Sequence, residues 1–215
     1  MRLLLPISVS ALLAGLAVFP ACTPQGDPAV GPEGFTDDFD RDDLGELWHN
    51  TGAGWRIVDG RLNIRNCRNR PLWLRRTLPH DVRIEFDAES TTPEGDIKVE
   101  VFGDGSSRAT TDAYTATSYV IIFGGWSNSW NGIARMDEHD ESTRVRGALG
   151  VRVVPNHTYH MRIERVGSRI TAWADDTMLG QKDDPSPLEG RGHDHFAFND
   201  WTVELWFDNL RITPL

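Results

Sequence analysis

Apolar and polar residues alternate with a period of two along most of the chain after Phe35. Residues 82–89 show this most clearly, because apolar side chains there alternate with charged ones. Such alternation predicts β-strands that bury one face and expose the other. Residues 97–101 repeat the pattern and place Lys98 and Glu100 on the predicted polar face.

Turn residues between the predicted strands indicate antiparallel pairing. Asp59-Gly60 separates two strand-like runs, and Gly167-Ser168 does the same further along the chain. Both dipeptides are typical of β-hairpins. Residues 119–123 are continuously apolar, which predicts a central strand covered on both faces. No stretch has the period of a helix longer than a turn or two, so the sequence predicts an all-β fold, an antiparallel sandwich or barrel.

The first residues follow a different pattern. Arg2 precedes a run of mostly apolar residues that ends at Ala21, directly before Cys22. This order is that of a secretory signal, and it resembles a bacterial lipoprotein signal whose cysteine is lipidated. We therefore predict a signal peptide over 1–21 and a lipid-anchored protein of the bacterial cell envelope. A plain secreted protein and an uncleaved anchor are the alternatives.

The residues after the leader predict a tether followed by one domain. Residues 22–34 contain prolines and glycines without an apolar pattern, which predicts a flexible tether before a single domain over 35–215.

The charge of the chain limits its partners, because it has 22 Lys and Arg against 32 Asp and Glu, a net charge of −10. Such a charge disfavours nucleic acid, whose phosphates need cations, but suits neutral sugars, cations or basic partners. With Cys22 lipidated, Cys67 has no disulfide partner. We expect a monomer.

Three segments resemble, in the same order, the concanavalin A-like lectin/glucanase superfamily. They are the opening 35–40, the hairpin over 54–62 and the ending 207–212. Within the superfamily they are similar to the laminin G-like and 3-keto-disaccharide hydrolase-like branch. The resemblance implies a jelly-roll β-sandwich. It leaves the activity open, because the superfamily includes lectins, hydrolases and lyases.

Two groups of residues are candidates for catalysis. Glu85, Asp87 and Glu89 have the E-x-D-x-E spacing of retaining glucanases in this superfamily. The resemblance implies a nucleophile, an electrostatic helper and an acid/base in that order. The alternative is a solvated acidic face. Glu138 and His139 form the second group, as an acid/base pair in a charged segment, with a charged hairpin tip as the alternative.

The loop over 124–132 is the best candidate for ligand binding. Indole rings offer flat platforms to the C–H face of a sugar, while amides supply directional hydrogen bonds to hydroxyl groups. The alternative is that the tryptophans plug one end of the sandwich. The predicted ligand-binding residues are Trp126, Asn128, Trp130, Asn131 and the nearby Arg135.

A structural calcium site is predicted where the first and last strands meet. Asp38 and Asp40 lie in the first strand region and Asp208 lies in the last. Carboxylate oxygens suit Ca²⁺, and relatives of this fold bind the ion with a terminal-strand aspartate. The alternative is that Asp208 caps a strand.

These observations favour an envelope lipoprotein whose sandwich binds carbohydrate without catalysis. The second hypothesis is a glycoside hydrolase or lyase resembling 3-keto-disaccharide hydrolases. The third is a structural envelope domain that binds another protein.

Overall fold

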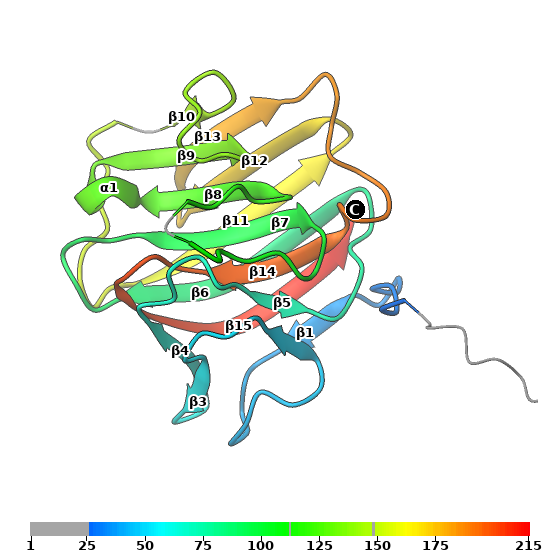
Figure 1. Cartoon of the computed structure of the whole chain (residues 1–215), viewed down its shortest axis with the longest axis horizontal. Coiled ribbons are helices and arrows are strands. Elements are labelled where there is room, and N and C mark those ends of the chain that lie inside the picture. The colour runs from blue at the N-terminus through cyan, green and yellow to red at the C-terminus, as the bar shows by residue number, and fades with distance from the viewer. Residues whose placement is uncertain (1–25, 112, 148) are drawn as a thin grey trace, which may run out of the picture.

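The computed structural model describes residues 26–215 except residues 112 and 148, and the described chain is almost entirely β-structure. Two antiparallel sheets stack face to face, as Figure 1 shows. The predicted all-β antiparallel sandwich is therefore confirmed. The leader, including Cys22, lies outside the described residues.

The two sheets have the following order. The first contains β13 (Thr177–Asp183), β12 (Arg169–Ala174), β11 (Thr158–Val166), β6 (Val82–Ser90), β15 (Glu204–Pro214), β4 (Arg61–Arg65) and β3 (Arg56–Val58), with β1 (Phe35–Asp37) also paired to β15. The second contains β10 (Val145–Arg146), β9 (Trp130–Arg135), β8 (Tyr119–Gly124), β7 (Ile97–Gly103), β14 (His195–Asn199), β5 (Leu72–Leu74) and β2 (Trp48–Asn50).

The core between the sheets is aromatic at its centre. Phe86 and Phe207 from the first sheet meet Phe198 from the second, with centroid distances to Phe198 of 5.4 Å and 4.4 Å. All three rings are completely buried. Period-two alternation supplies these side chains, since every second residue of β6 is buried. Burial of such rings is a main source of stability in a fold of this size.

The predicted local features are confirmed. Both hairpins form, because Val58 pairs with Arg61 and Val166 pairs with Arg169. Strand β8 is buried along its whole length, as its continuous apolar run predicts. The first strand, β1, pairs with the last, β15.

Strand β7 differs from its prediction. Alternation placed Lys98 and Glu100 on a polar face, yet they are only 3% and 0% exposed. The segments after β7 and β9 cover this outer face, where Tyr114 and Ala116 pack in a small cluster with Trp130 of β9. Local periodicity reports which side of the strand faces the core, but it cannot report that a loop covers the other side.

The chain contacts the sandwich before the predicted domain start at Phe35. Val30 is buried in the core, and Ala29 forms a parallel bridge with Thr77. Asp27 carries an ion pair to His195, with 3.2 Å between Oδ2 and Nε2. The ordered contacts thus reach into the part of the chain predicted as tether. Within the described residues, no helix has the length and apolar character to cross a membrane.

Candidate functional site

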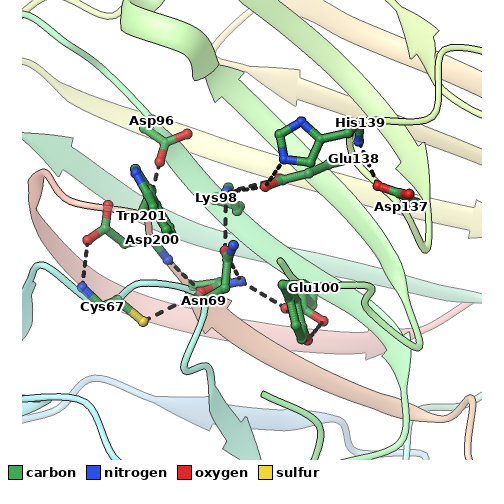
Figure 2. Close-up of polar contacts among 12 residues, drawn as sticks. Cys67, Asn69, Asp96, Lys98, Glu100, Asp137, Glu138, His139, Asp200 and Trp201 are labelled. Atoms are coloured by element: carbon green, nitrogen blue, oxygen red, sulfur yellow. Dashed lines mark hydrogen bonds and ion pairs between the residues drawn. The ribbon is translucent and has the colours of Figure 1, made fainter. Parts of the chain in front are cut away.

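A cavity of about 520 Å³ opens on the outer face of the second sheet, beside the start of β7. Strand β7 supplies its floor, the turn after β8 one wall, and the segments after β9 and β14 the others. Its lining includes Asn69, Glu94, Asp96, Lys98, Trp126, Glu138 and Trp201. Figure 2 shows Lys98 between Glu138 and Asn69, with a dashed line to each.

Lys98 is the charged centre of this pocket. Its Nζ lies 3.0 Å from Oε2 of Glu138 and donates a 3.3 Å hydrogen bond to Oδ1 of Asn69. Burial by itself lowers the pKa of an ammonium group, but the carboxylates of Asp96 and Glu138 outweigh it and the pKa of Lys98 is raised. Lys98 is therefore a permanent cation whose charge is balanced inside the protein.

Glu100 lies one strand period further along β7. It accepts hydrogen bonds from Ser118 Oγ at 2.6 Å, Tyr114 Oη at 3.0 Å and Asn199 Nδ2 at 2.8 Å. Burial nonetheless raises the pKa of Glu100 to about 7. Asn199 also donates to Oδ1 of Asn69, so Glu100 is connected to the groups around Lys98.

Two aspartates complete the buried network. Asp200 accepts hydrogen bonds from the backbone N–H groups of Cys67 and Val203, each at 3.2 Å. Burial, assisted by the charge of Asp96, raises the pKa of Asp200 to about 8. Asp96 accepts from the backbone of Trp201 at 3.1 Å, and burial raises its pKa as well.

Cys67 is a structural thiol in this network. It is completely buried, and its Sγ donates to the carbonyl oxygen of Arg70 at 3.1 Å. Burial raises the pKa of the thiol strongly, and the carboxylate of Asp200 raises it further. Such a thiol stays protonated and unreactive.

The tryptophan loop resolves into two roles. Trp130 is 6% exposed and packs under the loops, as expected of a plug. Trp126 is 40% exposed and lines the pocket. The two rings meet edge to face at 5.4 Å, and the Arg144 guanidinium lies 5.2 Å from the centroid of the Trp126 ring. Trp126 therefore has the surroundings of a platform and Trp130 those of a core residue.

An unusual backbone presents Trp126. The one-turn element α1 (Gly125–Asn128) has left-handed angles at Trp126 (φ 50°) and Ser127 (φ 56°). Side chains other than glycine adopt this conformation at a cost of about 1–2 kcal/mol each. The Asn128 amide holds the turn in place, because it accepts from the N–H of Val153 at 2.8 Å and donates to the Val153 carbonyl oxygen at 2.7 Å.

The other predicted ligand-binding residues have structural partners and do not line the pocket. The Asn128 amide is occupied by backbone, as described. Asn131 accepts from the N–H of Gly124 and donates to the carbonyl oxygen of Val151, each at 2.9 Å. Arg135 donates to Oδ2 of Asp184 at 2.9 Å. The Asn128 and Asn131 amides thus fix the loops beside the pocket, and Arg135 fixes the segment at Asp184.

Glu138 and His139, predicted as an acid/base pair, both line the pocket. Glu138 is 8% exposed and paired with Lys98, whereas the His139 ring is mostly exposed and meets Trp126 edge to face at 5.6 Å. The His139 Nε2 lies 3.9 Å from Oε1 of Glu138. Their proposed roles in catalysis stay predictions.

The Glu85, Asp87 and Glu89 set lies on β6, in the opposite sheet, and does not line this pocket. The His160 ring lies between two of the carboxylates, with Nε2 3.4 Å from Glu85 and Nδ1 3.3 Å from Asp87. Glu89 pairs with Arg61 at 3.2 Å. Glu85 and His160 line a separate, smaller cavity of about 360 Å³. These ion pairs match the alternative of a solvated charged face.

The predicted calcium residues each have a local hydrogen bond. Asp38 accepts from the N–H of Asp40, and Asp208 accepts from the N–H of Asn209, so both aspartates stabilise local turns. Asp38 is near enough to Asp208 to contribute to the raised pKa of Asp208, which burial mainly causes. Among the residues that the structure describes, however, no three His, Cys, Asp or Glu side chains are arranged to hold an ion.

Sequence reasoning missed most of the pocket. Asp37, which precedes the predicted calcium residue Asp38, is also absent from the predicted sites, although it accepts from Arg41 and from the Trp48 indole at 2.8 Å. Two features of the sequence could have indicated the pocket: a lysine inside a strand pattern, and the polar residues directly after β14. The pocket residues that sequence reasoning did not select include Asn69, Glu94, Asp96, Lys98 and Trp201. The buried network next to them adds Glu100 and Asp200.

Comparison with known proteins gives matches at the level of structure. No family model matches the chain, and no curated protein matches it. The carbohydrate-binding module CBM66 from Bacillus subtilis superposes with a TM-score of 0.57 at 16% identity, covering 78% of this chain and 95% of the module. A putative glycosyl hydrolase from Parabacteroides distasonis gives 0.56 at 13% identity, covering 82% and 92%.

A lectin-like structure is similar to the same extent. The exoplasmic/lumenal domain of VIP36, in its form bound to Ca²⁺ and Man3GlcNAc, gives a TM-score of 0.60 at 10% identity, covering 84% of this chain and 88% of that domain. At such identities the likeness establishes the fold and leaves the activity open. The matched structures and the two stacked antiparallel sheets together show that the described chain has a jelly-roll β-sandwich fold.

Proposed function

We propose that this protein binds carbohydrate in the pocket beside β7, with Trp126 as the stacking platform. The observation that carries the proposal is a 40% exposed indole at the edge of a cavity lined by amide and carboxyl groups. Sugar sites combine a flat apolar surface with a few directional polar groups in this way. The structural neighbours that are carbohydrate-binding modules and lectins support the proposal.

The strained turn at Trp126 gives independent support. Three consecutive non-glycine residues, 126–128, have left-handed φ angles that cost stability, and a fold keeps such a conformation only where its surroundings enforce it. Here the buried Asn128 side chain enforces it through three hydrogen bonds to Val153 and Pro93. The result is that Trp126 lines the cavity while Trp130, four residues later, is buried.

Replacing Trp126 by alanine should weaken oligosaccharide binding at least about tenfold, because a stacking surface worth about 1.5–3 kcal/mol is lost. A glycan array should select the ligand, and isothermal titration of the full chain should measure its affinity. Trp206→Ala is the matched control, since Trp206 is a partly exposed indole of the other sheet, paired with Arg61. Unchanged affinity in Trp126→Ala would place the binding site elsewhere.

A glycoside hydrolase is the second candidate function. It is favoured by two carboxyl groups in different surroundings at one cavity: Glu138 paired with a lysine, and Asp96 with a raised pKa. Acid/base pairs of glycosidases have this asymmetry. Product analysis of the same incubations separates the two functions. Release of shorter sugars that Glu138→Gln or Asp96→Asn abolishes would establish an enzyme, whereas binding without products supports the first proposal.

We also propose that the protein is anchored in the bacterial envelope through lipid on Cys22. This rests on the sequence order of Arg2, the apolar leader and Cys22. Mass spectrometry of the mature chain should find an N-terminal cysteine carrying acyl chains. Cys22→Ser should release the protein from membranes, and an unmodified mature N-terminus would overturn the proposal.

A further inference from the structure

We infer that the pocket selects sugars that carry a positive charge, namely oligosaccharides with free, protonated amino groups; this rests on the proposed function. The argument begins with the charges that line the cavity. Carboxyl groups come from Glu94, Asp96 and Glu138, and the only Lys or Arg among the described lining residues is Lys98. The lining is therefore acidic.

Lys98 cannot serve an anionic ligand. Its side chain is 4% exposed, and its Nζ is already engaged by both Glu138 oxygens, at 3.0 Å and 3.2 Å, and by Asn69. A carboxylate or sulfate on a sugar would have to displace Glu138, leaving a buried charge without a partner. The same ligand would meet the carboxyl groups of Glu94 and Asp96.

A cationic ligand meets favourable groups instead. Glu94 is exposed at the rim, and no described side chain forms an ion pair or hydrogen bond with it. Asp96 uses one oxygen for the Trp201 backbone. An ammonium group on a sugar ring would provide the counter-charge that Glu94 lacks and would add a second cation beside Asp96, while the C–H face of the ring packs on Trp126.

The aromatic groups favour the same ligand class. Guanidinium groups already lie over both pocket indoles, with Arg144 5.2 Å from the Trp126 centroid and Arg68 5.6 Å from the Trp201 centroid. These rings therefore accept cations at their faces. The charge of Arg144 is balanced by Glu141 at 2.6 Å, so it does not reverse the sign of the pocket.

The test compares three probes on the full chain at about pH 5.5, where sugar amino groups are protonated and an exposed carboxyl group is still ionised: a hexamer of β-1,4-linked glucosamine, its fully N-acetylated counterpart, and a galacturonic acid hexamer. The first two share a backbone and differ in charge. We expect the amino form to bind at least about tenfold more tightly than the acetylated form, and the uronate to bind weakest. Added salt should reduce the preference, because surface charges are screened.

Glu94→Gln should weaken binding of the amino hexamer about two- to fivefold and leave the acetylated hexamer unchanged, as expected for one exposed charge pair. Glu46→Gln is the matched control, because Glu46 is an exposed carboxylate outside the pocket lining and the change in net charge is the same. Equal affinity for the amino and acetylated hexamers, or preference for the uronate, would overturn the inference while leaving carbohydrate binding intact. Binding of the amino hexamer that neither Glu94→Gln nor Trp126→Ala alters, or no binding of any probe, would count against both.

Discussion

Replacing Lys98 by methionine should lower the free energy of unfolding by about 3–5 kcal/mol, because removal of one partner leaves buried charges uncompensated. The Lys98 ammonium lies 3.0 Å from Glu138. Methionine keeps a long, unbranched side chain at this position and removes only the charge. The positive charge of Lys98 also stabilises the ionised forms of Asp96, Glu100 and Asp200. Urea denaturation of the full chain would measure the loss.

The chain offers a matched control, since Lys182 is its other lysine. Lys182 lies on β13 and donates to the carbonyl oxygen of Thr143. Lys182→Met should change stability by about 1 kcal/mol or less. The double variant Lys98→Met/Glu138→Gln should recover part of the loss, because the orphaned carboxylate is removed. A loss in Lys98→Met no larger than that in Lys182→Met would contradict this account of the buried network.

The free energy of unfolding should fall as the pH rises from about 4 to 8, by an amount on the order of a few kcal/mol. Two groups cause this, since burial raises the pKa of Glu100 to about 7 and that of Asp200 to about 8. Both values lie above the ordinary values of 4.5 and 3.8. The folded state therefore holds protons that the unfolded state has released, and raising the pH through this window favours unfolding.

The direction of the pKa shift distinguishes Glu100 and Asp200 from Asp37 and Asp184. Hydrogen bonds hold the pKa of Asp37 and of Asp184 below 3.8 despite their burial. Their contribution to the free energy of unfolding is present when the pH is above 3.8, and it disappears as the pH falls through their lowered pKa. Acid destabilisation from this second group thus begins below about pH 4, and maximal stability should lie on the acidic side of neutrality.

Urea denaturation at several pH values tests the assignment. Glu100→Gln resembles the protonated form of Glu100, so this variant should be closest to the wild type near pH 5 and gain relative to it as the pH rises. Asp200→Asn should likewise reduce the fall in the free energy of unfolding with rising pH, at a higher pH than Glu100→Gln does. Glu46→Gln controls for the change in net charge. A wild-type stability that is constant or rises between pH 5 and 8 would contradict the raised pKa values.

Only part of the candidate site could be predicted from the sequence. Trp126, Glu138 and His139 were selected because their residue types are conspicuous in a loop, and all three line the pocket. Lys98 was assigned to a solvated face, since an alternating strand normally exposes its charged residues. Its burial results from loops that cross the strand, and nothing in residues 97–101 encodes that cover.

The acidic set on β6 shows the opposite error. Its spacing is that of a glucanase, and the spacing places all three carboxylates on one face, as the structure has them. Which sheet contains that strand, and what lies opposite it, depends on the order of strands in space. Here β6 lies between β11 and β15, in the sheet opposite the one that floors the pocket, where the His160 ring contacts Glu85 and Arg61 pairs with Glu89.

The strands, the hairpins and the fold class of this protein follow from the order of its residues, because period-two burial and turn chemistry are local properties. The pocket exists only in the folded chain. Asn69, Lys98, Glu138 and Trp201 are far apart in the chain and meet because β9, β8, β7, β14 and β5 are neighbours in one sheet. The loops that join these strands fold over the outer face of β7, and this long-range packing turns an apparently solvated lysine into the centre of a buried charge network.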